Sequence, residues 1–219
     1  MNGSPFALSL RATLLRMLTA AGFVALAVVV ASCSLSRPSP VKRMFLLEPK
    51  PPAVVAAAPK PVSLRVGVVS VAAPFRGKAF VFRETDLRYE SDFYDEFFTA
   101  PSIMFSDATA KALAASNVFS RVVPFGAVSD DGDYVLDGFV SELYADTRDA
   151  AAPAAVITVT YYLTRANFGS AVMWSREYRQ RAKVSGEGPD AVARGWNAAL
   201  TAILADLARD LAAAELPGK

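Results

Sequence analysis

A short basic and apolar segment that ends at a cysteine, residues 11–33, most constrains what this chain can fold into. Arg11 and Arg16 precede an uncharged run rich in Ala and Val, which closes with Val30-Ala31-Ser32-Cys33. This arrangement predicts a secretory signal peptide ending in a lipobox. The apolar run is too short to span a hydrocarbon core of ~30 Å comfortably as a helix. We therefore expect residues 1–32 to be removed, leaving them no part in the folded domain.

Cys33 is the only cysteine in the chain and stands at the cleavage position of the lipobox. We expect it to carry a lipid anchor of three acyl chains such as palmitate, and at ~0.8 kcal/mol per buried methylene such an anchor is effectively permanent. Ser34 follows Cys33. In lipoproteins of Gram-negative type, a residue other than Asp at this position usually permits export to the outer membrane. The expected location is the outer membrane, facing the periplasm. The alternative interpretations are a buried free cysteine and an ordinary signal peptide with a coincidental cysteine.

Composition excludes several classes of function. The precursor has 23 Lys+Arg and 21 Asp+Glu, and because residues 1–32 contain two arginines and no acid, the mature chain has 21 of each. This balance gives no support for nucleic-acid binding. The sequence has no histidine, so it offers neither a His metal site nor Ser-His-Asp or Cys-His catalysis. No cofactor besides the covalent lipid is expected.

Residues 33–61 are expected to form a tether between the anchor and the domain. Seven of residues 34–61 are proline, which favours extended polyproline II. The apolar island Met44-Phe45-Leu46-Leu47 interrupts this composition, so we expect residues 44–48 to be an edge strand docked on the domain and ended by Pro49. The domain itself is expected over residues 62–215, a usual length for a single domain.

Alternation of apolar and polar residues predicts the strands. They are expected at 62–71, 79–83, 87–90, 118–124, 134–144, 156–165 and 171–184. In the segment 156–165, Ile157 and Val159 share one face while Thr158 and Thr160 share the other, which is typical of a half-buried antiparallel strand. Turns at 84–86 and 166–170 predict a hairpin and a three-stranded meander.

Two helices complete the predicted fold. Thr99 as the cap and Pro101 in the first turn indicate where the first helix begins, and Asn117 ends it. After Pro189, apolar residues that include Trp196 recur at spacings of three and four residues, which predicts a long final helix packed on the sheet. The expected fold class is α/β, with a mixed, mostly antiparallel sheet and both helices on it.

Two short motifs resemble ligand sites but lack the required pattern. Asp130-Asp131-Gly132-Asp133 has neither the glycine nor the glutamate positions of an EF-hand loop, so we interpret it as a solvated turn. Gly186-Glu187-Gly188 is incomplete as a dinucleotide loop and marks the start of a helix instead. Cations on one side of the last strand either protect a sheet edge or contact lipid headgroups or an acidic partner. These are Arg179, Arg181 and Lys183.

An aromatic segment at residues 93–98 is the main candidate for partner contact. It has rings on both sides of an acidic pair, in the order Phe93-Tyr94-Asp95-Glu96-Phe97-Phe98. One buried face cannot absorb all four rings, so we expect some of them to be exposed. The candidate contact residues are Phe93, Tyr94, Phe97 and Phe98. Filling of the core is the alternative interpretation for aromatic residues in this region.

Behind the lipobox and tether, the order of strands and helices resembles the ABC-type transport auxiliary lipoprotein family, the PqiC-like lipoproteins that accompany MCE-domain lipid transporters. The segments that carry the resemblance are residues 44–49, 66–69, 82–89 and 134–144 and the Ala-rich final helix. The family implies an α/β domain related to the amino-terminal domain of TolB-like proteins, with no known catalytic residues. It also implies a periplasmic MCE-domain protein and an ABC permease and ATPase as partners.

Three classes of function follow. The first is a non-enzymatic outer-membrane lipoprotein serving a lipid transport system, as the resemblance implies. The second is a regulator or assembly factor of another envelope complex with the same kind of fold. The third, a hydrolase that uses carboxylates alone, has the least support because no Asp/Glu pair is linked to an evident pocket. The transported lipid and whether the protein forms a homo-oligomer stay open.

Overall fold

The computed structural model describes residues 41–127, 132–166 and 171–216. The expected signal peptide, Cys33 and the first part of the tether lie outside these described residues, as do Asp130, Asp131 and most of the turn at 166–170. Residues Val41–Lys219 make up one compact unit. None of the helices in the described ranges is long and apolar enough to cross a membrane.

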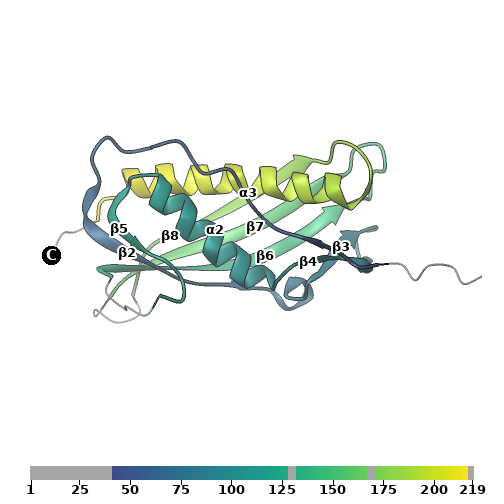
Figure 1. Ribbon diagram of the computed structural model, residues 1–219, viewed down its shortest axis with the longest axis horizontal. Helices are drawn as coiled ribbons and strands as arrows, with labels where there is room; N and C mark the ends of the chain where they lie inside the picture. Colours follow the sequence, from purple (N-terminus) through teal and green to yellow (C-terminus); the bar gives the residue numbers. More distant parts are fainter. Residues whose placement is uncertain (1–40, 128–131, 167–170, 217–219) are drawn as a thin grey trace, which may run out of the picture. The chain divides into compact units, whose positions relative to one another are not determined.

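The described residues form an eight-stranded sheet, a 3₁₀ turn and two long α-helices (Figure 1). In chain order these are β1 (Arg43–Phe45), β2 (Lys60–Val71), η1 (Ala73–Phe75), β3 (Ala79–Arg83), β4 (Tyr89–Phe97), α2 (Pro101–Ala115), β5 (Phe119–Val123), β6 (Tyr134–Asp146), β7 (Ala154–Arg165), β8 (Val172–Lys183) and α3 (Gly188–Ala213). The predicted α/β class with a mixed sheet and two helices is confirmed. The strand predicted at 87–90 is longer than expected, because β4 continues to Phe97.

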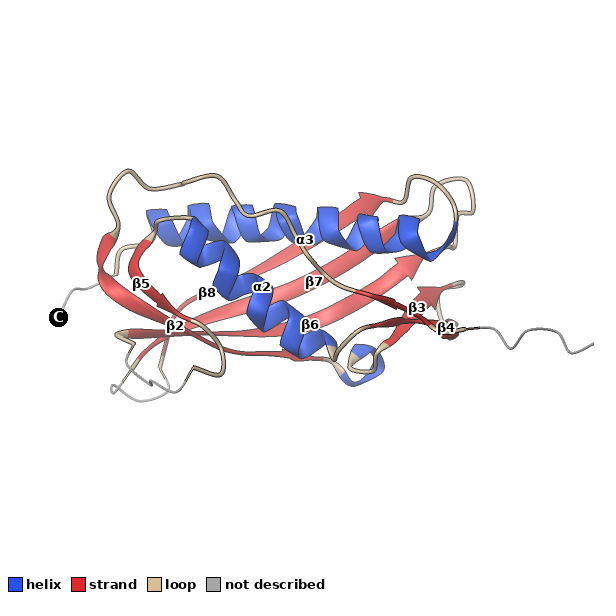
Figure 2. Ribbon diagram, viewed as in Figure 1, coloured by secondary structure: helices blue, strands red, loops and turns tan. Residues whose placement is uncertain are grey.

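The sheet is organised around the long strand β6. One edge of β6 pairs antiparallel with β7, which in turn pairs antiparallel with β8 as the predicted meander requires. The other edge of β6 has two parallel partners, β2 beside its first half and β3 beside its last residues. β5 lies outside β2, while β4 and β1 lie outside β3. The strands β3, β4 and β1 therefore form a small outer section at one end of the sheet (Figure 2).

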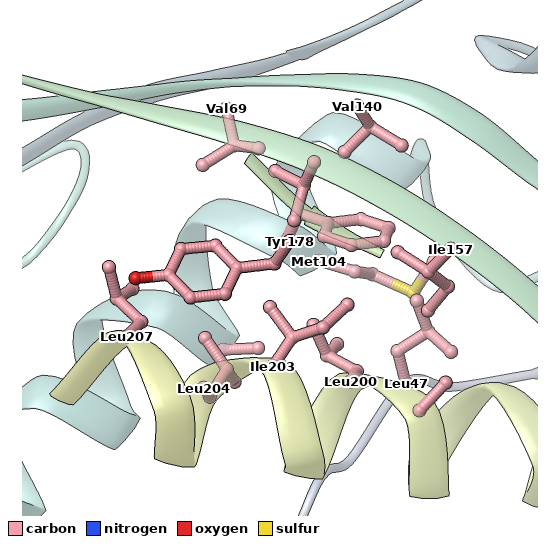
Figure 3. Packing of buried hydrophobic residues seen from close by; sticks show 14 of the residues in the cluster. Leu47, Val69, Met104, Val140, Ile157, Tyr178, Leu200, Ile203, Leu204 and Leu207 are labelled. Atoms are coloured by element: carbon pink, nitrogen blue, oxygen red, sulfur yellow. The ribbon is translucent and has the colours of Figure 1, made fainter. Parts of the chain in front are cut away.

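Both helices lie on the same face of the sheet, and the core fills the space between the two layers (Figure 2). Ile157 and Val159 of β7 and Leu200 and Ile203 of α3 have no exposed surface. Burying side chains of this size contributes about 1.5–3 kcal/mol each. Trp196 is also fully buried, and its Nε1 donates a hydrogen bond to the Tyr144 carbonyl oxygen at 3.3 Å. Figure 3 shows Ile157, Leu200 and Ile203 among the packed side chains of the core.

Helix α2 begins two residues later than Thr99, which the sequence suggested as its cap. The N-cap position is Ala100, with no side-chain cap, and Pro101 is the first helical residue. Proline starts a helix readily because its φ angle is already helical and its missing N–H has no partner at that position. Asn117 follows the helix with a φ of 58°. Asparagine tolerates this left-handed conformation, so the predicted end of the helix is confirmed.

Residues 46–59, which we call the strap, connect β1 to β2 and pack against both helices. The sequence predicted a free tether up to residue 61, with only residues 44–48 docked. In the structure Leu47 is buried among core side chains (Figure 3), and hydrogen bonds hold the rest of the strap. They run from Glu48 N–H to Asn197 Oδ1 (2.5 Å), Lys50 N–H to Thr201 Oγ1 (3.0 Å), Val55 N–H to the Ser116 oxygen (3.0 Å) and Asn117 Nδ2 to the Ala56 oxygen (2.9 Å).

The physical reason for this difference is that proline prevents regular secondary structure without preventing docking. Pro49, Pro51 and Pro52 keep the strap out of any strand or helix. Side chains of α3 and main-chain groups at the end of α2 replace the missing ladder partners. At the start of the strap, β1 pairs in parallel with β4, with Arg43 opposite Asp95.

Candidate functional site

Strand β4 departs from regular pairing in the middle of the predicted aromatic segment. Val81 of β3 lies opposite Ser91, but Ala79 lies opposite Glu96, so two steps along β3 correspond to five along β4. Three extra residues must therefore be accommodated, and we call residues 92–95 the aromatic bulge. Bulges turn side chains away from the directions that a regular strand allows. This explains how aromatic rings on both sides of an acidic pair coexist at the end of the sheet.

The Asp92 side chain holds the aromatic bulge together. Its Oδ1 accepts hydrogen bonds from the main-chain N–H groups of Tyr94 at 2.7 Å and Asp95 at 2.9 Å. Asp is suited to this position because its short side chain reaches main-chain donors two and three residues ahead. The Asp92 side chain thereby binds two consecutive main-chain donors in the irregular part of β4. Sequence reasoning did not single out Asp92, although an Asp two residues before Tyr94 was the available signal.

The bulge and the residues after it separate the four candidate rings. Phe93, Tyr94 and Phe98 are 72%, 40% and 60% exposed, whereas Phe97 is 2% exposed. Phe97 packs on Trp196, with ring centres 5.3 Å apart, and is part of the core. The expectation that Phe97 contributes to a contact surface is therefore wrong, because β4 resumes regular pairing there and directs Phe97 under the helices. The rings of Phe93 and Tyr94 meet edge to face, 5.1 Å apart.

Charged residues around the bulge are paired with one another. Arg43 makes two hydrogen bonds to the Asp95 carboxylate, at 2.7 and 2.9 Å. These bonds raise the pKa of Arg43 and tie β1 to β4. Lys42 Nζ lies 3.1 Å from the Glu96 carboxylate and 5.4 Å from the centre of the Phe93 ring. Because the charges neutralise each other, the exposed rings are the distinctive feature of this surface.

A second apolar feature is a groove of about 530 Å³ between the strap and α2. Its walls include Leu47 and Pro49 of the strap and Met104 of α2. Half-exposed Leu46 also lines it. The preceding residue, Phe45, accepts a hydrogen bond through its carbonyl oxygen from the Phe98 N–H at 2.8 Å. The groove arises only because the strap is docked, so the expectation of a free tether could not reveal it.

Two of the three cations predicted on the last strand, Arg179 and Arg181, form ion pairs. Arg181 pairs with Asp146, which is 1% exposed and also bound by Arg148, and Arg179 pairs with Glu142 at 3.2 Å. The hydrogen bond from Arg148, with a further one from Arg181, lowers the pKa of Asp146 well below its usual value. β8 pairs only with β7 among the described strands. These contacts agree with the interpretation of charges that protect an edge strand.

Other titratable groups inside the domain hold the helices onto the sheet. The Tyr161 hydroxyl lies 2.8 Å from Thr109 Oγ1 of α2, and burial raises the pKa of Tyr161 to about 12. The Tyr178 hydroxyl donates to Asp210 of α3 at 2.6 Å. A phenol that stays protonated at neutral pH is a hydrogen-bond donor rather than a general base. In the ranges that the structure covers, no cluster of three or more potential ligands could hold a metal ion.

Solved structures of other proteins share the fold described above. The crystal structure of protein XCC0632 from Xanthomonas campestris, of the DUF330 family, has a TM-score of 0.69 and 19% identity, covering 78% of this chain and 95% of that one. A second crystal structure, of an uncharacterized protein, has a TM-score of 0.61 and 16% identity, covering 78% and 99%. At these identities the likeness shows the fold alone.

A search among curated proteins found no similar sequence. The family model for the ABC-type transport auxiliary lipoprotein component matches residues 45–208. This range begins in β1, includes the strap and the aromatic bulge, and ends within α3. The resemblance drawn from the sequence is thus confirmed, and the chain belongs to the ABC-type transport auxiliary lipoprotein component family.

Proposed function

We propose that this protein is a non-enzymatic component of an MCE-associated lipid transport system, anchored through Cys33 to the periplasmic side of the outer membrane. Membership of the auxiliary lipoprotein family supports the role in transport. The observation that carries the proposal is the aromatic bulge, which displays Phe93 and Tyr94 to solvent at the end of the sheet. Its expected ligand is the periplasmic MCE-domain protein of the same system.

Exposed aromatic rings favour recognition for a physical reason. Phe and Tyr bury a large area on binding and lose little side-chain entropy, so they dominate many protein interfaces. The nearby charges of Arg43, Asp95 and Glu96 already have partners within the domain. We therefore expect the largest contribution to the binding free energy to come from burial of the rings of Phe93 and Tyr94.

The pairing of the carboxylates supports a role without catalysis. Asp95 is held by Arg43, Asp146 by Arg148 and Arg181, and Glu142 by Arg179. A general acid or base needs a pKa near the working pH. The lowered pKa of Asp146 moves that group further from neutrality.

The test is to replace both Phe93 and Tyr94 by Ala and to measure binding to the purified MCE-domain protein encoded in the same genome. Truncating a central aromatic residue of an interface costs about 2 kcal/mol or more, so affinity should fall at least ~30-fold. Leu87→Ala is a matched control, because Leu87 is 94% exposed in the turn before β4. The melting temperature should not change in either variant, since these side chains are exposed.

Three outcomes would contradict the proposal. Unchanged binding after removal of both rings would exclude the aromatic bulge as the contact surface. Loss of lipid transport in a variant such as Glu142→Gln, with fold and partner binding intact, would favour an enzyme that uses carboxylates. An MCE-domain protein that fails to bind even the unmodified protein would favour the alternative of a regulator or assembly factor for another envelope complex.

A further inference from the structure

The outer edge of β4 is only partly covered by another strand. β1 pairs with β4 at Asp95, Glu96 and Phe97, whereas β4 begins at Tyr89. Within the described ranges, β4 therefore has no strand partner on this edge over residues 89–94. An open edge can serve as a template for an added strand from another protein. The aromatic bulge lies at the point where such a strand would meet β1.

Asp92 and the aromatic bulge interrupt this open edge where it approaches β1. Its carboxylate already accepts the main-chain N–H group of Tyr94, so an added strand cannot use this donor at the end of the open stretch. It also accepts the N–H group of Asp95, where β1 already pairs with β4. The bulge also breaks the regular spacing that an added strand would need, which is one way that proteins protect open edges. Contact at the aromatic bulge itself is then expected to be made by side chains.

We propose that Asp92 is a positioning residue for partner binding. By fixing the main chain of the bulge, it holds the rings of Phe93 and Tyr94 in one arrangement before the partner arrives. Binding then costs less conformational entropy, because the rings need not be ordered on contact. The partner surface that fits is an apolar pocket on a folded domain, which receives a preformed pair of rings.

This role is separable from the stability of the fold. Both hydrogen bonds of Asp92 end within the aromatic bulge, and Phe93 and Tyr94 are exposed. The core contact of the same strand is made by Phe97 with Trp196, beyond the bulge. Removing the Asp92 carboxylate therefore frees the bulge while leaving the buried contacts of β4 in place.

The inference rests on the proposed function and is tested by calorimetric titration of the full chain with the purified MCE-domain protein. Asp92→Ala should weaken binding about tenfold, the effect of releasing two side chains that the complex must order again. Asp92→Asn keeps the accepting Oδ1 and should bind within about twofold of the unmodified protein. Glu90→Ala, which removes an exposed acid two residues away, is the control for loss of charge.

Amide hydrogen exchange supplies a second readout that a general loss of charge would not change. In Asp92→Ala the amides of Tyr94 and Asp95 should exchange faster, while those of β6 and β7 should not change. Weak binding by Asp92→Asn, equal to that of Asp92→Ala, would assign the effect to charge and overturn the positioning role. If Asp92→Ala binds normally while the variant lacking the rings of Phe93 and Tyr94 binds poorly, the positioning role of Asp92 is overturned. The proposed function would be left intact by that result.

Discussion

Residues of the same type on one strand have opposite roles in this domain. Phe93 and Phe97 are four positions apart on β4, yet one is 72% exposed and the other 2%. The three extra residues of the bulge change the alternation between them, so a regular inward and outward pattern does not apply. Charged residues differ in the same way. Asp146 is buried and bound by two arginines, whereas Glu90 is exposed.

Asp146→Asn should lower stability in a manner that depends on pH. The arginine contacts hold the folded-state pKa of Asp146 below its usual 3.8, so folding favours the ionised form. This contribution is complete above about pH 4 and is lost as pH falls through the folded-state pKa. At pH 7 the loss should be on the order of 1–2 kcal/mol, because solvent screens the half-exposed arginines.

Urea unfolding of both proteins between pH 7 and pH 3 measures this difference. The difference between the two free energies of unfolding should be constant near pH 7 and should begin to shrink below about pH 4, where the carboxyl group becomes protonated in the unfolded chain. Glu90→Gln is the control and should leave stability unchanged. A difference that is independent of pH would show that the Asn side chain acts through packing rather than charge.

Among the elements, the strap shows how a segment without secondary structure becomes part of a domain. Its prolines exclude it from the sheet and the helices, but Leu47 is buried and Asn197 and Thr201 of α3 accept its main-chain donors. The strap thereby connects α3 to the end of α2, where Val55 bonds to Ser116. The strap also forms one wall of the groove that lies between it and α2.

Leu47→Ala should destabilise the domain by about 2–3 kcal/mol, since it removes buried methyl groups and leaves a cavity. The neighbouring Leu46 is 46% exposed, and Leu46→Ala should stay within about 0.5 kcal/mol of the unmodified protein. The two adjacent leucines make a matched pair for urea unfolding. Equal effects of both substitutions would show that the strap is not docked in solution.

At the scale of the whole molecule, the folded domain and the expected membrane anchor are separate parts of the chain. The described unit begins at Val41, and the family match begins at residue 45. Cys33 lies outside the described residues, eight positions before Val41. Lipidation therefore rests on the lipobox pattern and stays a prediction.

Replacing Cys33 by Ala should prevent both acylation and cleavage, because acylation of the thiol precedes the action of the lipoprotein peptidase. Growth with a labelled fatty-acid analogue should label the unmodified protein and leave the Cys33→Ala precursor unlabelled and larger by the mass of residues 1–32. Ser34→Ala is the control and should be labelled normally. Incorporation of the analogue into the Cys33→Ala protein would contradict the lipobox interpretation.

Local patterns in the chain were enough to predict the meander, the final helix and the α/β class. The periods of strands and helices appear in the spacing of neighbouring apolar residues, as in Ile157 and Val159 of β7 or Leu200 and Ile203 of α3.

The local patterns also predicted that some rings of residues 93–98 are exposed, but not that Phe97 is buried. That outcome depends on the register of β4 against β3, which joins residues on separate strands. Docking of the strap likewise depends on Asn197 and Thr201, about 150 residues further along the chain. A periodic pattern records that one face of a segment is apolar, whereas the partner of that face is set by packing between distant segments.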